Sequence, residues 1–336
     1  MTRTAVLAGL GAWAPPRVVT NDEVASRIAE TDEWIRTRTG IGARRVAAPE
    51  MSTRDIAVQA GTRALRSSKL TTVDHLVLAT TTPDQVIPAT APSVATEMGL
   101  TGVAAFDLNA ACAGFVYGLG VATGLITSGV ADSVLLIAVD VLSTITNPND
   151  RMTAPLFGDG AGAVVLRAGE QGEPGVFAGF DLHSSGEHAD LINVPAGIRT
   201  YSMPDAVAEE TDRYIYMAGK EVFLAAVANM SSSSRTALAR AGHVIGDVDR
   251  VVGHQANIRI LHAVAKQLDL PQDRLVTNIE RFGNTSAASI PLALVDGVTS
   301  GALQPGHLVL MTAFGAGFTW GSTTVRWPDL AVEPVD

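Results

Sequence analysis

The sequence has very little cysteine and little charge for its length. Its 336 residues contain one cysteine, Cys112, and only 17% of them are charged. A single thiol excludes a disulfide framework and a zinc site built from cysteines, which is typical of a reducing compartment. The formal net charge of −10 argues against general binding to nucleic acid or to an anionic membrane. We therefore expect a cytoplasmic protein that binds neither.

Long apolar runs are lacking as well. No segment approaches the roughly 18 consecutive apolar residues of a membrane span. The N-terminal stretch MTRTAVLAGLGAWAPP superficially resembles a signal peptide, but its apolar run is short and only Arg3 precedes it. This stretch predicts a first β-strand over Ala5–Leu10 instead. Apolar residues (47%) and 32 glycines indicate a globular chain with a large core and many turns.

The chain contains an internal repeat. Thr127-Ser128-Gly129 recurs 172 residues later as Thr299-Ser300-Gly301, and counting back equally from each places Cys112 opposite Asn284. Each half alternates short apolar strands with amphipathic segments and ends in a glycine-rich turn and a strand. This pattern predicts an α/β fold of two related halves, residues 1–171 and 172–336, packed as five layers in the order α-β-α-β-α.

The single cysteine allows two interpretations. Cys112 lies between a predicted strand and a predicted helix, among small residues. Unpaired N–H groups and the helix dipole would favour its thiolate, which is the nucleophilic form. A free cysteine is just as often a small buried hydrophobe. The thiol alone does not separate these interpretations.

Two further polar residues favour the chemical interpretation. His254 follows an apolar strand and Asn284 begins a predicted helix, although each alone is more typical of a structural residue. The repeat places Asn284 opposite Cys112, and we expect His254 to face the same centre. A thiolate can accept an acyl group, while a neutral His and an Asn can stabilise the enolate formed when a second thioester loses CO₂.

Six motifs occur in the order typical of one enzyme family. They are DEWIRTRTGIGARR, ACAGFVYGL, DRMTAPLFGDGAGAVVL, GHQANIRI, GNTSAASIP and FGAGFTWGS. Over nearly its whole length the chain resembles β-ketoacyl-acyl-carrier-protein synthase III, an initiating condensing enzyme of thiolase fold. The resemblance leaves open whether the chain serves fatty-acid synthesis or is a polyketide-associated member.

The resemblance implies a role for each site residue. It makes Cys112 the acyl-accepting nucleophile, with His254 and Asn284 assisting decarboxylation of a malonyl group. The backbone N–H groups of Cys112 and Ala316 would form the oxyanion hole, although many relatives have glycine in place of Ala316. The residues implied to bind coenzyme A are Trp34, Arg38, Arg151, Lys220 and Arg259.

Ile87 and Phe223 are the residues implied for the acyl pocket. The position of Ile87 is contributed across a dimer interface and is aromatic in acetyl-specific relatives. A smaller aliphatic side chain there predicts a larger pocket that accepts longer or branched primers. The resemblance also implies a homodimer.

The function implied is a decarboxylative condensation of an acyl-CoA primer with malonyl-acyl carrier protein. The alternative is a related acyltransferase that moves an acyl group from coenzyme A or a carrier protein to a hydroxyl or amine of a small molecule. Acyl-CoA is expected as a substrate, and no metal or redox cofactor is indicated. The resemblance also implies a basic patch that docks an acidic carrier protein. Of this patch the chain keeps Arg259 and Lys266, but it has Leu224 and Gln267 where well-known relatives have lysines.

Overall fold

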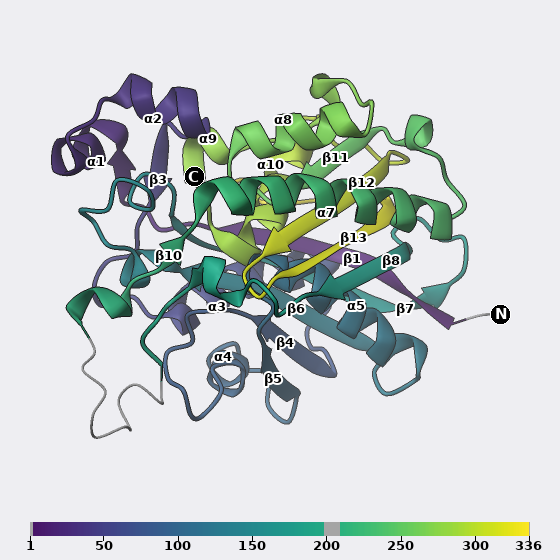
Figure 1. Cartoon of the computed structure of the whole chain (residues 1–336). Coiled ribbons are helices and arrows are strands. Elements are labelled where there is room, and N and C mark those ends of the chain that lie inside the picture. The colour runs from purple at the N-terminus through teal and green to yellow at the C-terminus, as the bar shows by residue number, and fades with distance from the viewer. Residues whose placement is uncertain (1–2, 198–208, 336) are drawn as a thin grey trace.

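Two β-sheets with helices between and outside them form the core of the molecule (Figure 1). The computed structural model describes residues 3–197 and 209–335. The first sheet has the order β1-β7-β6-β4-β5, and the second has the order β11-β12-β13-β8. Strands β4, β5 and β6 run parallel, as do β11 and β12, and the other pairs in both sheets are antiparallel.

The strands of each sheet come from one part of the chain. Those of the first sheet are β1 (Arg3–Trp13), β4 (His75–Ala79), β5 (Ala104–Leu108), β6 (Ser133–Val141) and β7 (Asp159–Glu170). Those of the second are β8 (Phe177–Ser184), β11 (Arg250–Gly253), β12 (Leu308–Gly315) and β13 (Thr319–Arg326). The predicted first strand, Ala5–Leu10, therefore exists and is longer than expected.

Five helices complete the layers. Helix α3 (Thr53–Ser68) covers the outer face of the first sheet, and α7 (Gly219–Arg240) with α8 (Ile258–Gln267) lies outside the second. Helices α5 (Gly114–Thr127) and α10 (Ser289–Thr299) lie between the sheets. The α-β-α-β-α arrangement predicted from the sequence is confirmed.

The sequence of the two central helices explains their place. Helix α5 has no charged residue and α10 has only Asp296. A helix that is apolar on all sides has to be buried on all sides. Their side chains pack with residues of both sheets in one core cluster, which includes Phe115, Leu119, Ile290 and Leu292.

The remaining elements are short. They are β2 (Val18–Thr20), α1 (Asn21–Ile28), α2 (Asp32–Thr39), β3 (Ala43–Arg45), α4 (Ala91–Glu97), β9 (Ile192–Asn193), β10 (Tyr216–Met217) and α9 (Ile279–Phe282), with 3₁₀ turns at Ala111–Ala113, Leu142–Ile145, Ala189–Leu191, Glu210–Arg213, Ile245–Asp247, Gln272–Arg274 and Ser286–Ala288. None of the helices in the described part of the chain has the length and apolar character needed to cross a membrane.

The repeat is visible in the sheets, with a register different from the one predicted. His75 pairs with Val134 in the first sheet and Arg250 with Val309 in the second, so equivalent residues are 175 positions apart. The counterpart of Cys112 is therefore Ala287 and not Asn284. The prediction was wrong because it counted back from the helix ends, and α5 has 14 residues whereas α10 has 11.

The true counterpart of Asn284 is Asn109. The Asn109 Oδ1 accepts a hydrogen bond from Ala111 N at 3.1 Å, and the Asn284 Oδ1 accepts one from Ser286 N at 2.9 Å. Ala111 and Ser286 both have left-handed backbones, with φ of 46° and 51°. Both halves therefore enter their central helix through the same kind of turn.

Close packing of β1 against α3 generates a stability prediction. A Cβ atom on Gly11 would lie 2.4 Å from the backbone N of Ala64, whereas one on Gly124 would meet nothing within 4 Å. We expect Gly11→Ala to lower the free energy of unfolding by about 1–3 kcal/mol through overpacking. Gly124 is exposed near the C-terminal end of α5, beyond the part enclosed by the sheets, so Gly124→Ala should leave the free energy of unfolding unchanged or raise it by up to about 1 kcal/mol. Denaturant unfolding of both variants measures this, and equal effects would contradict it.

Candidate active site

Cys112 lies in the 3₁₀ turn Ala111–Ala113, between the end of β5 and the start of α5. It is partly buried and lines a cavity of about 390 Å³. The other residues lining this cavity are Thr81, Asn109, Ala110, Ala111, Leu142, Ile145, Phe157, Ile192, Asn193, Val194, Ile215, Ser286, Ala316, Gly317 and Thr319. The cavity beside the thiol is therefore mainly apolar.

The turn between β12 and β13 closes over the backbone of Cys112. A Cβ atom on Gly315 would lie 2.6 Å from the Cys112 N, so only glycine allows this approach. The Thr319 hydroxyl donates to the carbonyls of Ala110 (2.8 Å) and Ala316 (3.1 Å), which ties the two segments together. Ala316 does not have a positive φ, so alanine fits this position without strain and keeps its backbone N–H.

The thiol of Cys112 is not activated in the way its place before a helix suggested. Burial raises its pKa to about 11, and the negative charge of Asp140 adds to the rise. A hydrogen bond from the Ser286 hydroxyl, 3.5 Å from Sγ, opposes it. Burial is thus the largest influence on the thiol, and it opposes the effect that the sequence suggested for the helix start.

His254 follows β11 and is buried, with 3% of its surface exposed. Its Nδ1 lies 2.7 Å from the hydroxyl of Ser289, the first residue of α10, and its backbone N donates to Thr312 O at 2.9 Å. Burial lowers the pKa of His254 to about 4. The imidazole is therefore neutral at pH 7, as the chemical interpretation of the sequence required.

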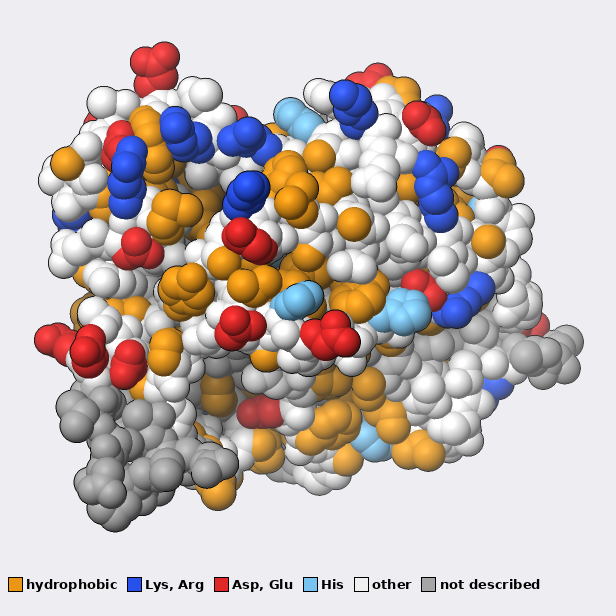
Figure 2. All heavy atoms as spheres, viewed as in Figure 1, with side chains coloured by type: hydrophobic (Ala, Val, Ile, Leu, Met, Phe, Trp, Pro, Cys, Tyr) orange, Lys and Arg blue, Asp and Glu red, His pale blue; other side chains and the backbone are white. Residues whose placement is uncertain are grey.

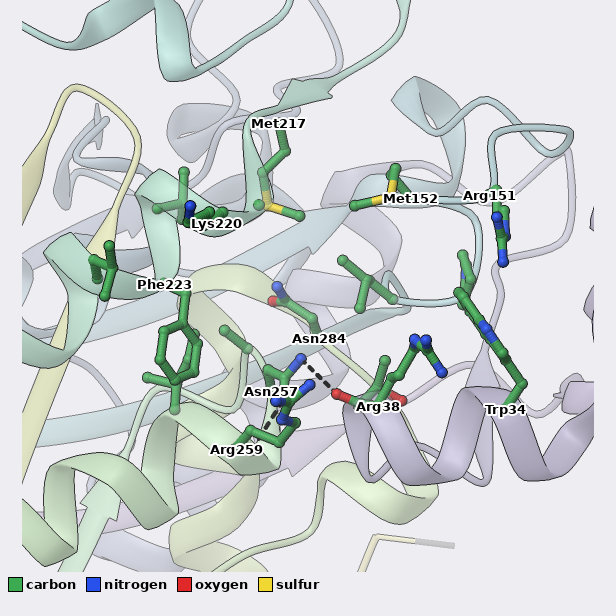
Figure 3. Close-up of a pocket in the computed structure, with 18 residues that line it drawn as sticks. Trp34, Arg38, Arg151, Met152, Met217, Lys220, Phe223, Asn257, Arg259 and Asn284 are labelled. Carbon is green, nitrogen blue, oxygen red and sulfur yellow. Dashed lines mark hydrogen bonds between the residues drawn. The ribbon is translucent and has the colours of Figure 1, made fainter.

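Asn284 is held by its own backbone and side chain. Its N donates to Leu156 O at 2.8 Å, and its carbonyl accepts from Gly158 N at 3.0 Å. Because the Asn284 Oδ1 accepts from Ser286 N, the Nδ2 group remains available as a donor. The Asn284 side chain lines a second cavity of about 460 Å³ (Figure 3).

This second cavity brings together all the residues expected to bind coenzyme A. Its labelled lining residues in Figure 3 are Trp34, Arg38, Arg151, Met152, Met217, Lys220, Phe223, Asn257, Arg259 and Asn284. They come from α2, β10, α7, the start of α8 and the segments before β7 and α10. On the face shown in Figure 2, Lys and Arg side chains gather at the upper left, over the region of α2 and the start of α8.

Trp34 has two cationic neighbours. The guanidinium carbons of Arg38 and Arg151 lie 4.6 Å and 5.0 Å from the centre of its ring, and Arg151 also forms an ion pair with Glu30. These distances allow cation–π contacts with both arginines. An aromatic face and two guanidinium groups in one place suit a ligand that has both a flat ring and phosphates.

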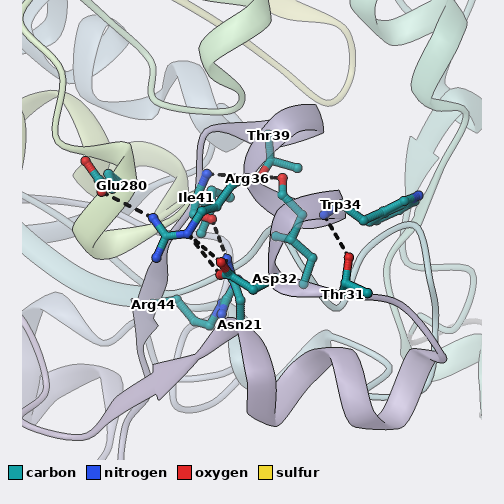
Figure 4. A network of polar contacts seen from close by, with 10 residues as sticks. Asn21, Thr31, Asp32, Trp34, Arg36, Thr39, Ile41, Arg44 and Glu280 are labelled. Carbon is teal, nitrogen blue, oxygen red and sulfur yellow. Dashed lines mark hydrogen bonds and ion pairs between the residues drawn. The ribbon is translucent and has the colours of Figure 1, made fainter.

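A polar network behind α2 positions this wall of the cavity (Figure 4). The Asn21 Nδ2 donates to Asp32 and to Ile41 O, both at 2.7 Å, and its Oδ1 accepts from Arg44 at 2.8 Å. Arg44 also donates to Pro155 O, next to the cavity-lining segment. The sequence interpretation missed Asn21 and Arg44, because buried partners that are distant in sequence leave no local pattern.

Of the two residues expected in the acyl pocket, Phe223 lies in another cavity, and Ile87 was expected in the pocket of a dimer partner. Phe223 lines the cavity that contains Trp34 and not the one beside Cys112. Ile87 is 84% exposed and lines neither of these two cavities. The aliphatic residues beside Cys112 were missed, since Leu142, Ile145 and Ile215 come from separate connecting segments.

Among residues 3–197 and 209–335, the His, Cys, Asp and Glu side chains form no group of three or more that could hold a metal ion.

Comparisons with known proteins agree with this architecture. A family model described as 3-oxoacyl-[acyl-carrier-protein (ACP)] synthase III matches residues 106–186, and one for the C terminal of the same synthase matches residues 238–327. The chain is 52% identical over 330 residues to beta-ketoacyl-[acyl-carrier-protein] synthase III 5 of Streptomyces coelicolor, covering 98% of this chain and 99% of the relative.

Solved structures show the same similarity. A 3-oxoacyl-(acyl carrier protein) synthase III from Pseudomonas aeruginosa superposes with a TM-score of 0.92 at 48% identity, covering 98% of this chain and 99% of the other. The priming beta-ketosynthase of the R1128 polyketide pathway gives a TM-score of 0.90 at 34% identity, with 98% of each chain covered. Fold and comparisons define a condensing enzyme of the acyltransferase class. The chain belongs to the 3-oxoacyl-[acyl-carrier-protein] synthase III family, as the resemblance of its motifs predicted.

The raised pKa of Cys112 generates a prediction for its reactivity. Only the thiolate is alkylated, so with a pKa of about 11 the rate with iodoacetamide should rise about tenfold per pH unit from pH 7 to 10. In denaturant the rate should level off at lower pH, because the burial that raises the pKa is lost. No other thiol competes, since the chain has a single cysteine. A native rate that levels off near pH 7 would contradict the prediction.

Proposed function

We propose that this chain condenses an acyl-CoA primer with malonyl-acyl carrier protein through an acyl-Cys112 intermediate, and so starts fatty-acid or polyketide chains. The observation that carries the proposal is the turn Asn284–Ser286. Ser286 lines the apolar cavity beside Cys112, and Asn284 lines the arginine-rich cavity. One turn therefore joins a space suited to an acyl chain with a space suited to a nucleotide thioester.

In the first step the Cys112 Sγ attacks the thioester carbonyl of the primer. A C–S bond to Cys112 forms, the C–S bond to coenzyme A breaks, and the thiol proton leaves with the coenzyme A sulfur. The backbone N–H groups of Cys112 and Ala316 donate to the oxyanion. This hole is fixed before the substrate arrives, because Gly315 and Thr319 hold the two segments together.

In the second step the malonyl thioester loses CO₂. Neutral His254 and the Asn284 Nδ2 donate hydrogen bonds to its thioester carbonyl and stabilise the enolate. The enolate carbon attacks the acyl carbonyl, forms the C–C bond and releases the Cys112 sulfur, which regains a proton. No general base is needed, since decarboxylation itself generates the carbanion.

The nucleotide portion of coenzyme A fits the arginine-rich cavity, which is lined by Trp34. The Trp34 ring would stack on adenine, and Arg38, Arg151 and Arg259 would contact phosphates, with Lys220 on the opposite wall. The bound acyl-CoA is a substrate and no other cofactor is invoked. Such substrates and a free thiol suit a cytoplasmic enzyme.

A homodimer would complete the acyl pocket. Strand β5 is an edge strand, and Phe106 on it is 37% exposed. Val86 and Ile87 are among the most exposed large apolar side chains of the described residues. An open strand edge beside exposed apolar residues is typical of an interface between copies. Ile87 would then reach the partner's cavity beside Cys112.

Separating the two steps tests the proposal. Intact-mass analysis after incubation with acyl-CoA should show an acyl adduct on the native enzyme and none on Cys112→Ala. Asn284→Ala should still form the adduct, but CO₂ release from malonyl-carrier protein should fall about 100–1000-fold with the lost donor. Asn149→Ala, in an exposed loop, serves as the control. Transfer of the acyl group to a hydroxyl or amine without CO₂ release would favour the alternative acyltransferase instead.

A change at Ile87 tests the dimer and the primer range together. In a homodimer Ile87→Phe should fill the partner's pocket, so kcat/KM for branched or six-carbon acyl-CoA should fall at least about tenfold relative to acetyl-CoA. Val86→Phe makes the same change one residue away and should leave the ratio unchanged. Strict acetyl preference in the native enzyme would contradict the prediction.

A further inference from the structure

Asp140 is a fully buried carboxylate for which the reaction steps above have no use. It lies near the end of β6 and has no exposed surface. Its Oδ1 accepts hydrogen bonds from the backbone N and the hydroxyl of Thr81, both at 2.7 Å, and lies 3.3 Å from the Thr80 hydroxyl. Burial of a carboxylate costs desolvation free energy, which its hydrogen-bond donors have to offset.

The second oxygen of Asp140 reaches the other half of the molecule. Its Oδ2 accepts from the backbone N of Ala287 at 3.3 Å, at the entry to α10. The preceding residue, Ser286, has a φ of 51°, a left-handed conformation that is strained for a residue other than glycine. The Asn284 side chain closes this turn from within, and Asp140 adds a contact from the other half of the molecule.

The turn held by Asp140 positions both parts of the proposed site. From one side, Ser286 N donates to the Asn284 Oδ1 and so orients the amide toward the arginine-rich cavity. From the other, the Ser286 hydroxyl donates to the Cys112 Sγ at 3.5 Å. A shift of this turn would displace the donor for the enolate and the partner of the thiol at once.

The repeat gives independent support. At 175 positions from Asp140 lies Gly315, and at 175 positions from Ala287 lies Cys112. Asp140 binds the N–H of Ala287, whereas a Cβ on Gly315 would press against the N of Cys112. One half thus has a carboxylate at the position where the other half has a glycine packed against the backbone of its nucleophile.

We propose that Asp140 is a positioning residue of the condensing site, which holds the turn Asn284–Ala287 so that Ser286 faces Cys112 and Asn284 faces the malonyl thioester. The part that concerns Cys112 and Ser286 stands on geometry alone. The part that concerns Asn284 rests on the proposed function.

The charged groups around Asp140 determine what its removal does to the thiol. From β7 it faces Asp159, a second buried carboxylate, and from the turn before α5 it faces Cys112. The segment Thr80–Thr82 and the turn before α10 contribute only hydroxyl and N–H donors. Burial raises the pKa of Asp140 itself, while hydrogen bonds from Thr81, Ser286 and Ala287 lower it. In its ionised form Asp140 raises the pKa of Cys112, so a neutral residue in its place should lower that pKa at pH values where Asp140 is charged.

Asp140→Asn tests the proposal, with Asp159→Asn as its matched control. Asp159 is equally buried, but its hydrogen bonds come from Ala47 N and from Ser143, so its loss should lower folding stability and slow condensation less than Asp140→Asn does. In Asp140→Asn we expect kcat for condensation to fall about 100-fold, as for a misplaced donor, with KM for acyl-CoA changed less than about threefold. We also expect the iodoacetamide profile of Cys112 to move along the pH axis, because the variant loses the charge that raises the thiol pKa and the support of the Ser286 hydroxyl that lowers it. Should Asp140→Asn fail to fold, Thr81→Val removes one donor to the same oxygen and should reduce kcat in the same direction.

Two results would overturn the proposal. One is an alkylation profile of Asp140→Asn that superposes on that of the native enzyme. The other is a condensation rate no lower than that of Asp159→Asn. The alkylation measurement uses no substrate, so it reports on Asp140 even if the native enzyme fails to condense malonyl-carrier protein, which would count against the proposed function alone.

Discussion

The burial of two apolar helices between two sheets is the constraint on which the rest of the structure depends. Helices α5 and α10 lack the polar face that would let them lie on a surface, so both sheets have to cover them. The repeat then brings the two helix starts to the middle of the molecule. Cys112 precedes one, and Asn284 and Ser286 precede the other. A site assembled there is inside the core, and its chemistry follows from that location.

Interior location determines the protonation of the site. Burial keeps the Cys112 thiol protonated and the His254 imidazole neutral at pH 7, by raising one pKa and lowering the other. A neutral thiol can transfer its proton to the departing coenzyme A sulfur, and a neutral imidazole can donate to an oxyanion without carrying charge. Hydrogen bonds are stronger in such surroundings than in water. The low polarity that opposes a resting thiolate therefore favours stabilisation of the enolate.

The sequence predicted the layers well, because apolar periodicity is local. It predicted the residues of the arginine-rich cavity through long motifs that occur in a typical order. Trp34, Arg38, Arg151, Lys220 and Arg259 do line one cavity. Prediction from the sequence failed for features that depend on contacts between distant parts of the chain. The repeat register was three residues off because α10 is shorter than α5. The burial that raises the pKa of Cys112 could not be read from a single turn. The support of α2 by Asn21 and Arg44, and of the Asn284 turn by Asp140, joins residues far apart in sequence and left no pattern to recognise.

The two arginines over Trp34 have a consequence for the enzyme without substrate. An uncovered indole in this cavity would expose apolar surface that favours nonspecific association. Here Arg38 and Arg151 cover it, and Glu30 holds one of them in place. When a nucleotide binds as proposed, the guanidinium groups of Arg38 and Arg151 can leave the indole and contact phosphate oxygens. The adenine would then stack on the Trp34 ring in their place. The same side chains would then cover the Trp34 ring in the resting form and bind the phosphates in the occupied form.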